Sequence, residues 1–445
     1  MTLSAIRCVS FTSLALCSAF AAAAAAQDTA GKTIPTALFD YVRRPEPAFA
    51  WKVVSNHDLA EGRMYDVALT SQVWHDITWQ HILHIHEPAE VRHPQHVLLF
   101  VTGGGTGRQP GAGDLAMGRK LAELTGARVA MLFQVPNQPL FGDRVEDDLI
   151  TETWLRYLES GDETWPLLFP MVKSAVKAMD AIQALAKERW SQPVIGFVIS
   201  GASKRGWTSW LTPVADRRIV ATAPLVIDTL NFRKQMQHQL DTWGKYSEQI
   251  DDYTSKGLIK PGDESPREQR LREMMDPYTY HSLLSLPKLL INGTNDRYWV
   301  VDATQFYWHD LVGPKYILQV PNAGHGLDGG RDLALATLSV FFQHAVTDTP
   351  LPQVAWEYPE GNASDPIVLH VTASTKPAAA RLWTARSPSK DFREARWQAQ
   401  PLEESGGKFA GVVERPQNGY VAHYGELQYE FAGVPYSLCT LIRQD

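Results

Sequence analysis

The run Val194-Ile-Gly-Phe-Val-Ile-Ser-Gly-Ala-Ser203-Lys-Arg-Gly-Trp207 decides the fold class of this 445-residue chain. Its first half is continuously apolar, which is typical of a strand covered on both faces of a parallel sheet. Its second half places Gly201 and Gly206 around Ser203 and then reads as the start of a helix. A sharp strand-to-helix turn needs small residues, because larger side chains would collide there. The run therefore predicts an exposed nucleophilic serine at the carboxyl end of a buried strand.

The run departs from the common form of this turn at one position. A glycine usually stands two residues after the serine, whereas this chain has Arg205 there and a glycine one residue later. The alternative interpretation is a glycine-rich turn in which Ser203 is an ordinary helix N-cap.

Two later predicted strands are each followed by a residue that would complete a catalytic triad. Asp296 follows the apolar run at residues 288–291, and His325 follows the run at 316–320 with a glycine on each side. A carboxylate next to the histidine would orient it and stabilise its charged form. Serine, aspartate and histidine in this chain order are typical of α/β hydrolases.

The acid member of the triad has two alternatives. Asp228 ends the strand that precedes residues 288–291 in the chain, a position that some α/β hydrolases use, and Asp302 lies six residues after Asp296. Taken alone, Asn295-Asp296 is ordinary turn chemistry.

A glycine run supports the same site. The apolar stretch at residues 97–101 leads into Gly103, Gly104 and Gly105. Glycines let backbone N–H groups approach a developing oxyanion, so we expect one donor from Gly104 or Gly105 and the other from the N–H of Lys204. The stretch lacks the G-K-[ST] of a phosphate-binding loop and does not fit G-x-G-x-x-G, which argues against a phosphate cradle.

The wider chain alternates strand-like and helix-like segments up to residue 348, which predicts a mostly parallel sheet with helices on both faces. Residues 229–286 are polar and helix-favouring and are expected to form a cap insertion. Short alternating runs separated by turn residues follow at 349–445 and predict an all-β sandwich domain. The fold class expected is α/β hydrolase with a cap and a C-terminal β domain. The strand-like runs lie at residues 64–73, 77–86, 96–101, 129–134, 194–199, 219–227, 288–291 and 316–320.

The first 26 residues read as a signal peptide. They hold a single charged residue, Arg7, a long apolar or small stretch, and an A-x-A cleavage site at Ala24 to Ala26. A retained membrane anchor and a lipoprotein modified at Cys17 are the alternatives. Cleavage leaves Cys439 as the one cysteine, so the mature chain is expected to be exported, periplasmic or secreted, without an internal disulfide.

The composition excludes several classes of partner. A net charge of −7 and a pI near 6.1 argue against a protein that binds nucleic acid through a basic surface. Beyond the leader, no segment reaches 18 apolar residues, so no membrane contact is expected after cleavage. His84 and His86 would share one face of a strand, but the pattern supplies no third ligand. We therefore expect no metal and no cofactor.

Four motifs together resemble the PhoPQ-activated pathogenicity-related protein family, namely residues 201–207, 292–299, 307–311 and 320–327. The resemblance covers roughly residues 35–440. It implies an α/β-hydrolase-like catalytic domain, a C-terminal β domain and export. The segment Ser203-Lys204-Arg205-Gly206 also looks like the same turn in glucuronoyl esterases, which implies that the Lys204 side chain helps to hold the oxyanion.

Together, these expectations predict a secreted serine hydrolase of the esterase type that uses Ser203, His325 and Asp296. Its expected partner is a small-molecule or carbohydrate ester. A serine peptidase, and a non-catalytic binding or signalling protein on the same scaffold, are the alternatives. The aromatic residues that would line the substrate pocket, or else pack in the core, are Trp207, Tyr298 and Trp299.

Overall fold

The computed structural model describes residues 34–362 and 365–445. The predicted signal peptide at residues 1–26 lies outside the described residues. Within the described residues, none of the helices is long and apolar enough to cross a membrane.

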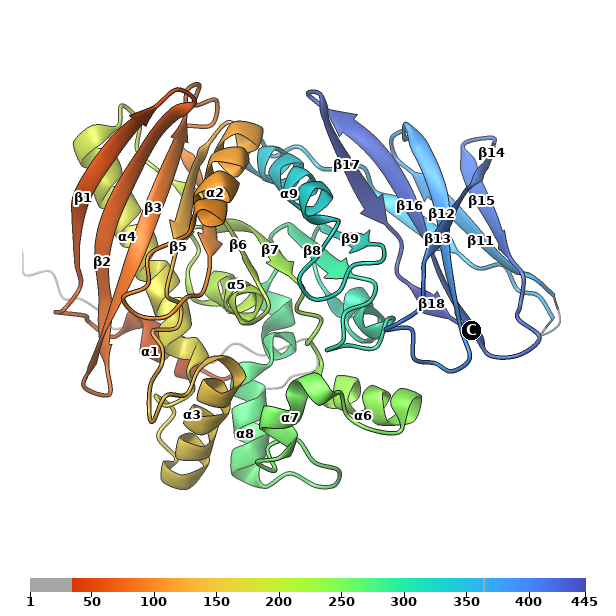
Figure 1. Ribbon diagram of the computed structural model, residues 1–445, viewed down its shortest axis with the longest axis horizontal. Coiled ribbons are helices and arrows are strands. Elements are labelled where there is room, and N and C mark those ends of the chain that lie inside the picture. The colour runs from red at the N-terminus through yellow and green to blue at the C-terminus, as the bar shows by residue number, and fades with distance from the viewer. Residues whose placement is uncertain (1–33, 363–364) are drawn as a thin grey trace, which may run out of the picture.

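A nine-stranded sheet forms the centre of the molecule (Figure 1), in the order β1-β2-β3-β5-β4-β6-β7-β8-β9. The strands from β5 to β9 pair in parallel, whereas β1, β2, β3 and β5 pair antiparallel in turn. Every strand-like run expected before residue 320 is a strand of this sheet. Their bounds are β1 Ala50–Leu59, β2 Gly62–Trp74, β3 Ile77–Pro88, β4 His96–Val101, β5 Arg128–Leu132, β6 Gly196–Ala202, β7 Ile219–Leu225, β8 Lys288–Gly293 and β9 Lys315–Val320.

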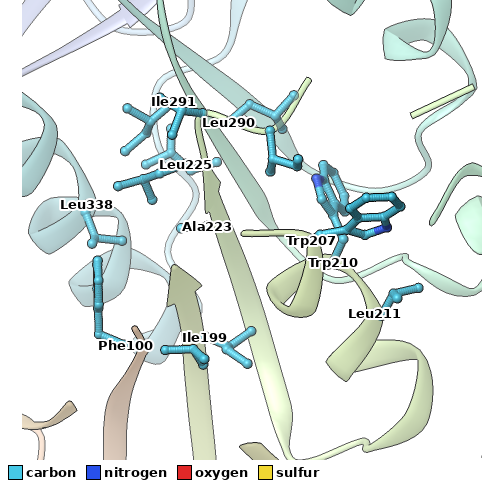
Figure 2. Close-up of a cluster of buried hydrophobic side chains, with 14 of the residues drawn as sticks. Phe100, Ile199, Trp207, Trp210, Leu211, Ala223, Leu225, Leu290, Ile291 and Leu338 are labelled. Carbon is cyan, nitrogen blue, oxygen red and sulfur yellow. The ribbon is translucent and has the colours of Figure 1, made fainter. Parts of the chain in front are cut away.

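Helices cover both faces of the sheet. One group, α1 (Ala37–Arg43), α4 (Leu168–Arg189) and α5 (Lys204–Ala215), packs together, and α2 (Ala112–Thr125) and α9 (Arg331–Val346) form the second group. Figure 2 shows Leu338 of α9 on one side of the central strands and Trp210 of α5 on the other. Both side chains are fully buried. The continuous apolar runs of β6 and its neighbours follow from this double cover.

The cap insertion lies between β7 and β8 and consists of short helices. It holds α6 (Phe232–Trp243), α7 (Asp251–Thr254), α8 (Pro266–Met275) and several 3₁₀ turns, and α7 and α8 pack against α3 (Glu146–Ser160). Helix α8 begins at a capping box, in which Ser265 and Glu268 each accept a hydrogen bond from the other's backbone N–H. The cap and α3 thus form one layer below the carboxyl ends of the central strands in the view of Figure 1.

The C-terminal part forms two antiparallel sheets that pack face to face. Gly425 of the second sheet lies against Val371 and Leu369 of the first, where an added Cβ would lie 3.1 Å from Val371 Cγ2 and 3.4 Å from Leu369 Cδ2. The domain lies beside β9 and α9, which contact β17. The first sheet contains β10 Val354–Glu357, β11 Ile367–Ala373, β15 Lys408–Val413 and β14 Glu403–Ser405, and the second β13 Gln398–Pro401, β12 Ala379–Ser387, β16 Tyr420–Phe431, β17 Val434–Cys439 and β18 Arg443–Gln444.

Candidate active site

Ser203 occupies the sharp turn between β6 and α5. Its backbone has φ 56° and ψ −123°, a conformation that costs a non-glycine residue on the order of 1–3 kcal/mol. A Cβ on Gly201 would lie 2.8 Å from the Arg205 carbonyl oxygen, and one on Gly206 would lie 2.9 Å from the Gly201 oxygen. The two glycines therefore meet the steric needs of the turn, although they are spaced differently from the common pattern.

His325 and Asp296 form a hydrogen-bonded pair. Asp296 follows β8, His325 follows β9, and the distance between His325 Nδ1 and Asp296 Oδ2 is 2.7 Å. The other carboxylate oxygen, Asp296 Oδ1, accepts the Tyr298 backbone N–H at 2.9 Å. The Asp296 carboxylate accepts a hydrogen bond from the Nδ1–H of His325. This favours the histidine tautomer in which Nε2 is unprotonated and free to act as a base.

Ser203 and His325 line one small pocket of about 30 Å³. The ring of Tyr298 lies against the His325 ring, with 4.4 Å between centroids. His325 is partly exposed, whereas Asp296 is buried. The structure therefore brings the three residues that we predicted as a triad to one place, with the serine and the histidine facing the pocket and the carboxylate behind the imidazole.

The two alternative acids have other partners. Asp228 accepts hydrogen bonds from the hydroxyls of Tyr307 and, at 2.7 Å, Thr304. Burial raises the pKa of Asp228 to about 6, and these hydrogen bonds lower it in part. Asp302 pairs with His238 Nε2 at 2.7 Å. Asp296 is thus the carboxylate that contacts His325.

The Arg205 side chain packs against the loop that contains the glycine run. Its guanidinium donates to Glu146 Oε2 at 2.7 Å and Oε1 at 2.8 Å, and its Nε donates to the Val135 carbonyl at 2.6 Å. A Cβ on Gly103 would overlap this guanidinium, so the glycine allows the close contact. Gly104 has φ 108°, which side-chain-bearing residues rarely adopt.

Of the expected oxyanion donors, Lys204 lines the pocket with Ser203 and His325, whereas Gly104 and Gly105 do not line it and belong to the loop next to the Arg205 contact. Glu146 also accepts from the Gln138 side chain at 2.7 Å, and the Gln138 carbonyl accepts the Thr106 N–H at 2.7 Å, so one network holds both ends of the loop with Gly104 and Gly105. Burial raises the pKa of Glu146, but the Arg205 hydrogen bond and the charges of Arg205 and Lys204 outweigh it and lower the pKa to about 2. Glu146 is thus a charged anchor for the loop.

The Lys204 side chain is held by carboxylates. Its Nζ donates to Asp147 Oδ2 at 3.0 Å and lies 3.4 Å from Glu146 Oε2. Asp147 also accepts from the Tyr253 hydroxyl at 3.0 Å. The Lys204 backbone N–H belongs to the first turn of α5, whose amides have no partner within the helix. The backbone amide, rather than the ammonium group, is therefore the better oxyanion donor at this position.

The predicted aromatic residues all line the pocket, with different roles. The Trp207 side chain is buried and its Nε1–H donates to the Met275 carbonyl at 2.7 Å, so its polar group is already used. Trp299 Nε1 is buried and has no hydrogen-bond partner among the described residues, and the same is true of Thr229 Oγ1. Both residues line the pocket beside Ser203. Such groups are costly to leave unpaired, which marks Trp299 and Thr229 as candidate substrate contacts.

Sequence reasoning missed Arg205, Glu146 and Thr229 as site residues. Arg205 carried a visible signal, since a large charged residue stood where a small one was expected. Glu146 and Thr229 carried none, because their roles depend on contacts that span 59 residues in the first case and on an unpaired hydroxyl in the second.

His81 and His84 make local polar contacts, whereas neither ring nitrogen of His86 has a hydrogen-bond partner among the described residues. His84 Nε2 lies 3.3 Å from Asp66 Oδ1, and His81 lies between the Ser71 hydroxyl at 2.9 Å and the Phe133 carbonyl at 3.1 Å. Across residues 34–362 and 365–445, no group of three or more His, Cys, Asp or Glu side chains is placed to hold a metal ion.

Comparisons with known proteins give a family and a fold. A family model described as PhoPQ-activated pathogenicity-related protein matches residues 38–393. The autocrine proliferation repressor protein A of Dictyostelium discoideum is 30% identical over 435 residues, covering 89% of this chain and 86% of that protein. The solved structure of an acetyl xylan esterase from Paenibacillus sp. R4 covers 68% of this chain and 91% of its own, with a TM-score of 0.50 and 14% identity. The predicted family resemblance and the predicted α/β-hydrolase fold are thus confirmed.

Proposed function

This chain belongs to the PhoPQ-activated pathogenicity-related protein family, and from its site geometry we propose that it is an exported serine hydrolase that cleaves carboxylic esters. The observation that carries the proposal is the 2.7 Å contact between His325 Nδ1 and Asp296 Oδ2, at a pocket that Ser203 also lines. An oriented imidazole beside a serine on a strained turn is the arrangement that activates a hydroxyl for acyl transfer.

The proposed reaction has two halves. His325 Nε2 takes the Ser203 hydroxyl proton while Oγ attacks the ester carbonyl, and the Lys204 backbone N–H together with Gly104 or Gly105 stabilises the oxyanion. His325 then gives its proton to the departing alcohol, which leaves an acyl-enzyme. A water molecule, deprotonated by the same imidazole, attacks this acyl group and releases the acid and the free serine. Asp296 keeps the imidazole oriented and stabilises its charged form throughout.

A fluorophosphonate probe tests the proposal directly, because it reacts covalently only with an activated serine. We expect labelling at Ser203, located by peptide mass mapping, and loss of both labelling and ester hydrolysis in Ser203→Ala. Ser389→Ala is the matched control, since Ser389 is exposed in the β domain. Full hydrolysis by Ser203→Ala would overturn the assignment.

A panel of acyl esters, carbohydrate esters and peptides separates the esterase from the peptidase. Small-molecule or carbohydrate esters are the substrates proposed.

A second candidate function, a non-catalytic signalling protein, is favoured by the name of the relative that is 30% identical, a proliferation repressor. A folded protein that neither reacts with the probe nor hydrolyses any member of the panel would favour that function.

Export is proposed on the leader sequence alone. Cleavage after Ala26 would give a mature chain that begins at Gln27. N-terminal sequencing of the protein recovered from outside the cytoplasm is expected to start there, and an intact N-terminus in a cytoplasmic fraction would contradict export.

A further inference from the structure

The cap and α3 enclose a second cavity next to the catalytic pocket. Its volume is about 240 Å³, against about 30 Å³ for the pocket with Ser203 and His325. Four side chains line both spaces: Trp207, Phe232, Met236 and Ile259. The cap cavity and the catalytic pocket therefore share a wall.

The catalytic pocket by itself is too small for an ester substrate. A volume of about 30 Å³ is about one fifth of the ~150 Å³ of an apolar cavity that binds benzene. The cap cavity, at about 240 Å³, exceeds the ~150 Å³ of an apolar cavity that binds benzene. A substrate group of the size of an aromatic ring or a medium-length acyl chain therefore fits the cap cavity and not the pocket.

The lining of the cap cavity favours an apolar, uncharged group. Trp154, Leu271 and Met275 form part of it and are buried. Its charged side chains comprise three cations and four carboxylates, so there is no excess positive charge to hold an anion; they are Arg233, Lys260, Arg272, Asp263, Glu264, Glu268 and Asp276. Two of the cations are already paired, Lys260 with Glu268 at 2.6 Å and Arg272 with Glu264 at 2.9 Å.

The shared wall contains side chains that can move. Met236 is unbranched, with a flexible thioether that adopts many shapes at small cost. Phe232 is only half-buried at the first residue of α6. Displacement of these two side chains would join the two spaces without a change in the backbone.

We propose that the cap cavity receives the apolar group of the ester substrate, at least one aromatic ring or a medium-length chain in size, after Met236 and Phe232 move aside. This inference rests on the proposed ester hydrolysis at Ser203. It adds the class of substrate, a neutral ester with a substantial apolar group. Trp299 and Thr229 would remain beside the reacting carbonyl to pair with its polar part.

Leu271→Trp tests the inference, because Leu271 lines the cap cavity but not the catalytic pocket. With p-nitrophenyl esters, kcat/KM for the octanoate is expected to fall at least about tenfold in this variant, and kcat/KM for the acetate to stay within about twofold, since loss of apolar contacts is worth on that order. A parallel series of alkyl acetates, from ethyl to phenethyl, determines whether the acyl or the alcohol side enters the cavity; selective loss in either series supports the inference.

Two further variants keep the test decisive. Leu271→Ala enlarges the cavity and is expected to shift the preferred chain towards longer esters, so an overpacked, unfolded Leu271→Trp protein does not end the experiment. Val412→Trp, at an exposed position of β15, is the bulky control and should leave the octanoate-to-acetate ratio unchanged.

The outcomes separate this inference from the proposed function. If the variants hydrolyse the acetate and react with the fluorophosphonate at Ser203, but the chain-length profile does not change, the cap cavity is not the substrate site. If the unmodified protein hydrolyses no ester and its Ser203 does not react, the proposed function itself fails.

Discussion

Asn322 and Trp397 exchange two hydrogen bonds between the α/β domain and the C-terminal β domain. The Trp397 N–H donates to Asn322 Oδ1 at 2.8 Å, and Asn322 Nδ2 donates to the Trp397 carbonyl at 3.1 Å. Asn322 lies three residues before His325, in a left-handed conformation with φ 58°. The β domain thus holds the loop that carries the histidine.

The same segment of the β domain also holds the loop that carries the carboxylate. Asn295, directly before Asp296, donates from Nδ2 to the carbonyls of Ala395 at 2.7 Å and Arg393 at 3.2 Å. Within the α/β domain the two loops are joined by the Asn322 N–H, which donates to Thr294 Oγ1 at 2.9 Å. Residues 392–397 therefore act as a common support for both loops.

Asn322→Gly is expected to lower kcat about tenfold with a smaller effect on KM. Glycine tolerates the left-handed backbone but removes both hydrogen bonds to Trp397, which should also lower the free energy of unfolding by about 1–3 kcal/mol. Asn322→Ala adds backbone strain and should be more severe. Asn418→Gly, in a turn of the β domain, is the control. Reduced stability in Asn322→Gly with unchanged kcat would show that the contact is structural only.

Asp296→Asn and Asp228→Asn are expected to separate the two candidate acids. In Asp296→Asn, the amide oxygen is needed to accept the Tyr298 N–H, so the NH₂ group turns toward His325 Nδ1 and favours the other tautomer. The kcat should therefore fall about 10³–10⁴-fold, as in Ser-His-Asp triads. Asp228 contacts Tyr307 and Thr304, so its variant should stay within a few-fold of the unmodified protein. Ester hydrolysis under saturating substrate measures both. The reverse ranking would assign the acid to Asp228.

The pH dependence of stability should carry a contribution from Asp228. Burial raises its pKa to about 6 in the folded protein, above the ordinary 3.8. The folded state therefore binds the proton more tightly, so this contribution to stability is complete below about pH 3.8 and is lost as pH rises through about 6. The stability of Asp228→Asn relative to the unmodified protein should thus improve between pH 4 and pH 7, as measured by urea unfolding. A difference that is constant with pH would rule out this titration.

Arg205→Lys is expected to reduce kcat by about 10- to 100-fold, which is less than the about 10²–10³-fold that complete removal of an oxyanion donor costs. Lysine cannot reproduce the paired hydrogen bonds to Glu146 or the third to Val135, so the loop with Gly104 would shift. Arg218→Lys is the matched control, since Arg218 makes a comparable paired contact with Asp216 away from the site. Equal loss in both variants would indicate a general effect on stability, which thermal unfolding would reveal.

Lys204→Met should destabilise the fold more than the double variant Lys204→Met with Asp147→Asn. Removing the lysine leaves the Asp147 carboxylate buried without its cation, which costs about 3–5 kcal/mol, and neutralising both partners relieves this penalty. Free energies of unfolding for the four members of the cycle give the coupling. Additive effects would show that the pair is not coupled.

The sequence allowed prediction of those features whose cause lies within a short stretch of chain. A strand covered on both faces is continuously apolar, so β4, β6 and β8 were recognisable. Edge strand β1 alternates between partly and largely exposed residues, and β13 and β14 are exposed throughout, so none of the three carried an apolar signal. The short helix α1 lies among prolines and was not expected.

The residues of the candidate site also fall into those that the sequence could predict and those that it could not. Ser203, Asp296 and His325 could be proposed because each follows a strand, and parallel strands bring their carboxyl ends to one edge of the sheet. Which of several carboxylates meets the histidine depends on side-chain geometry, and the contacts of Arg205 with Glu146 and of Asn322 with Trp397 join distant parts of the chain. No local pattern encodes such partners.

The support that residues 392–397 give to the two loops has a consequence for biosynthesis. A ribosome makes the serine turn, the carboxylate loop and the histidine loop before it makes this segment. Until the last strands have folded into place, the nascent polypeptide lacks the contacts of Asn295 and Asn322. Under the proposed function, ester hydrolysis would therefore begin only at the end of translation and folding, which would spare esters in the compartment where the chain is made.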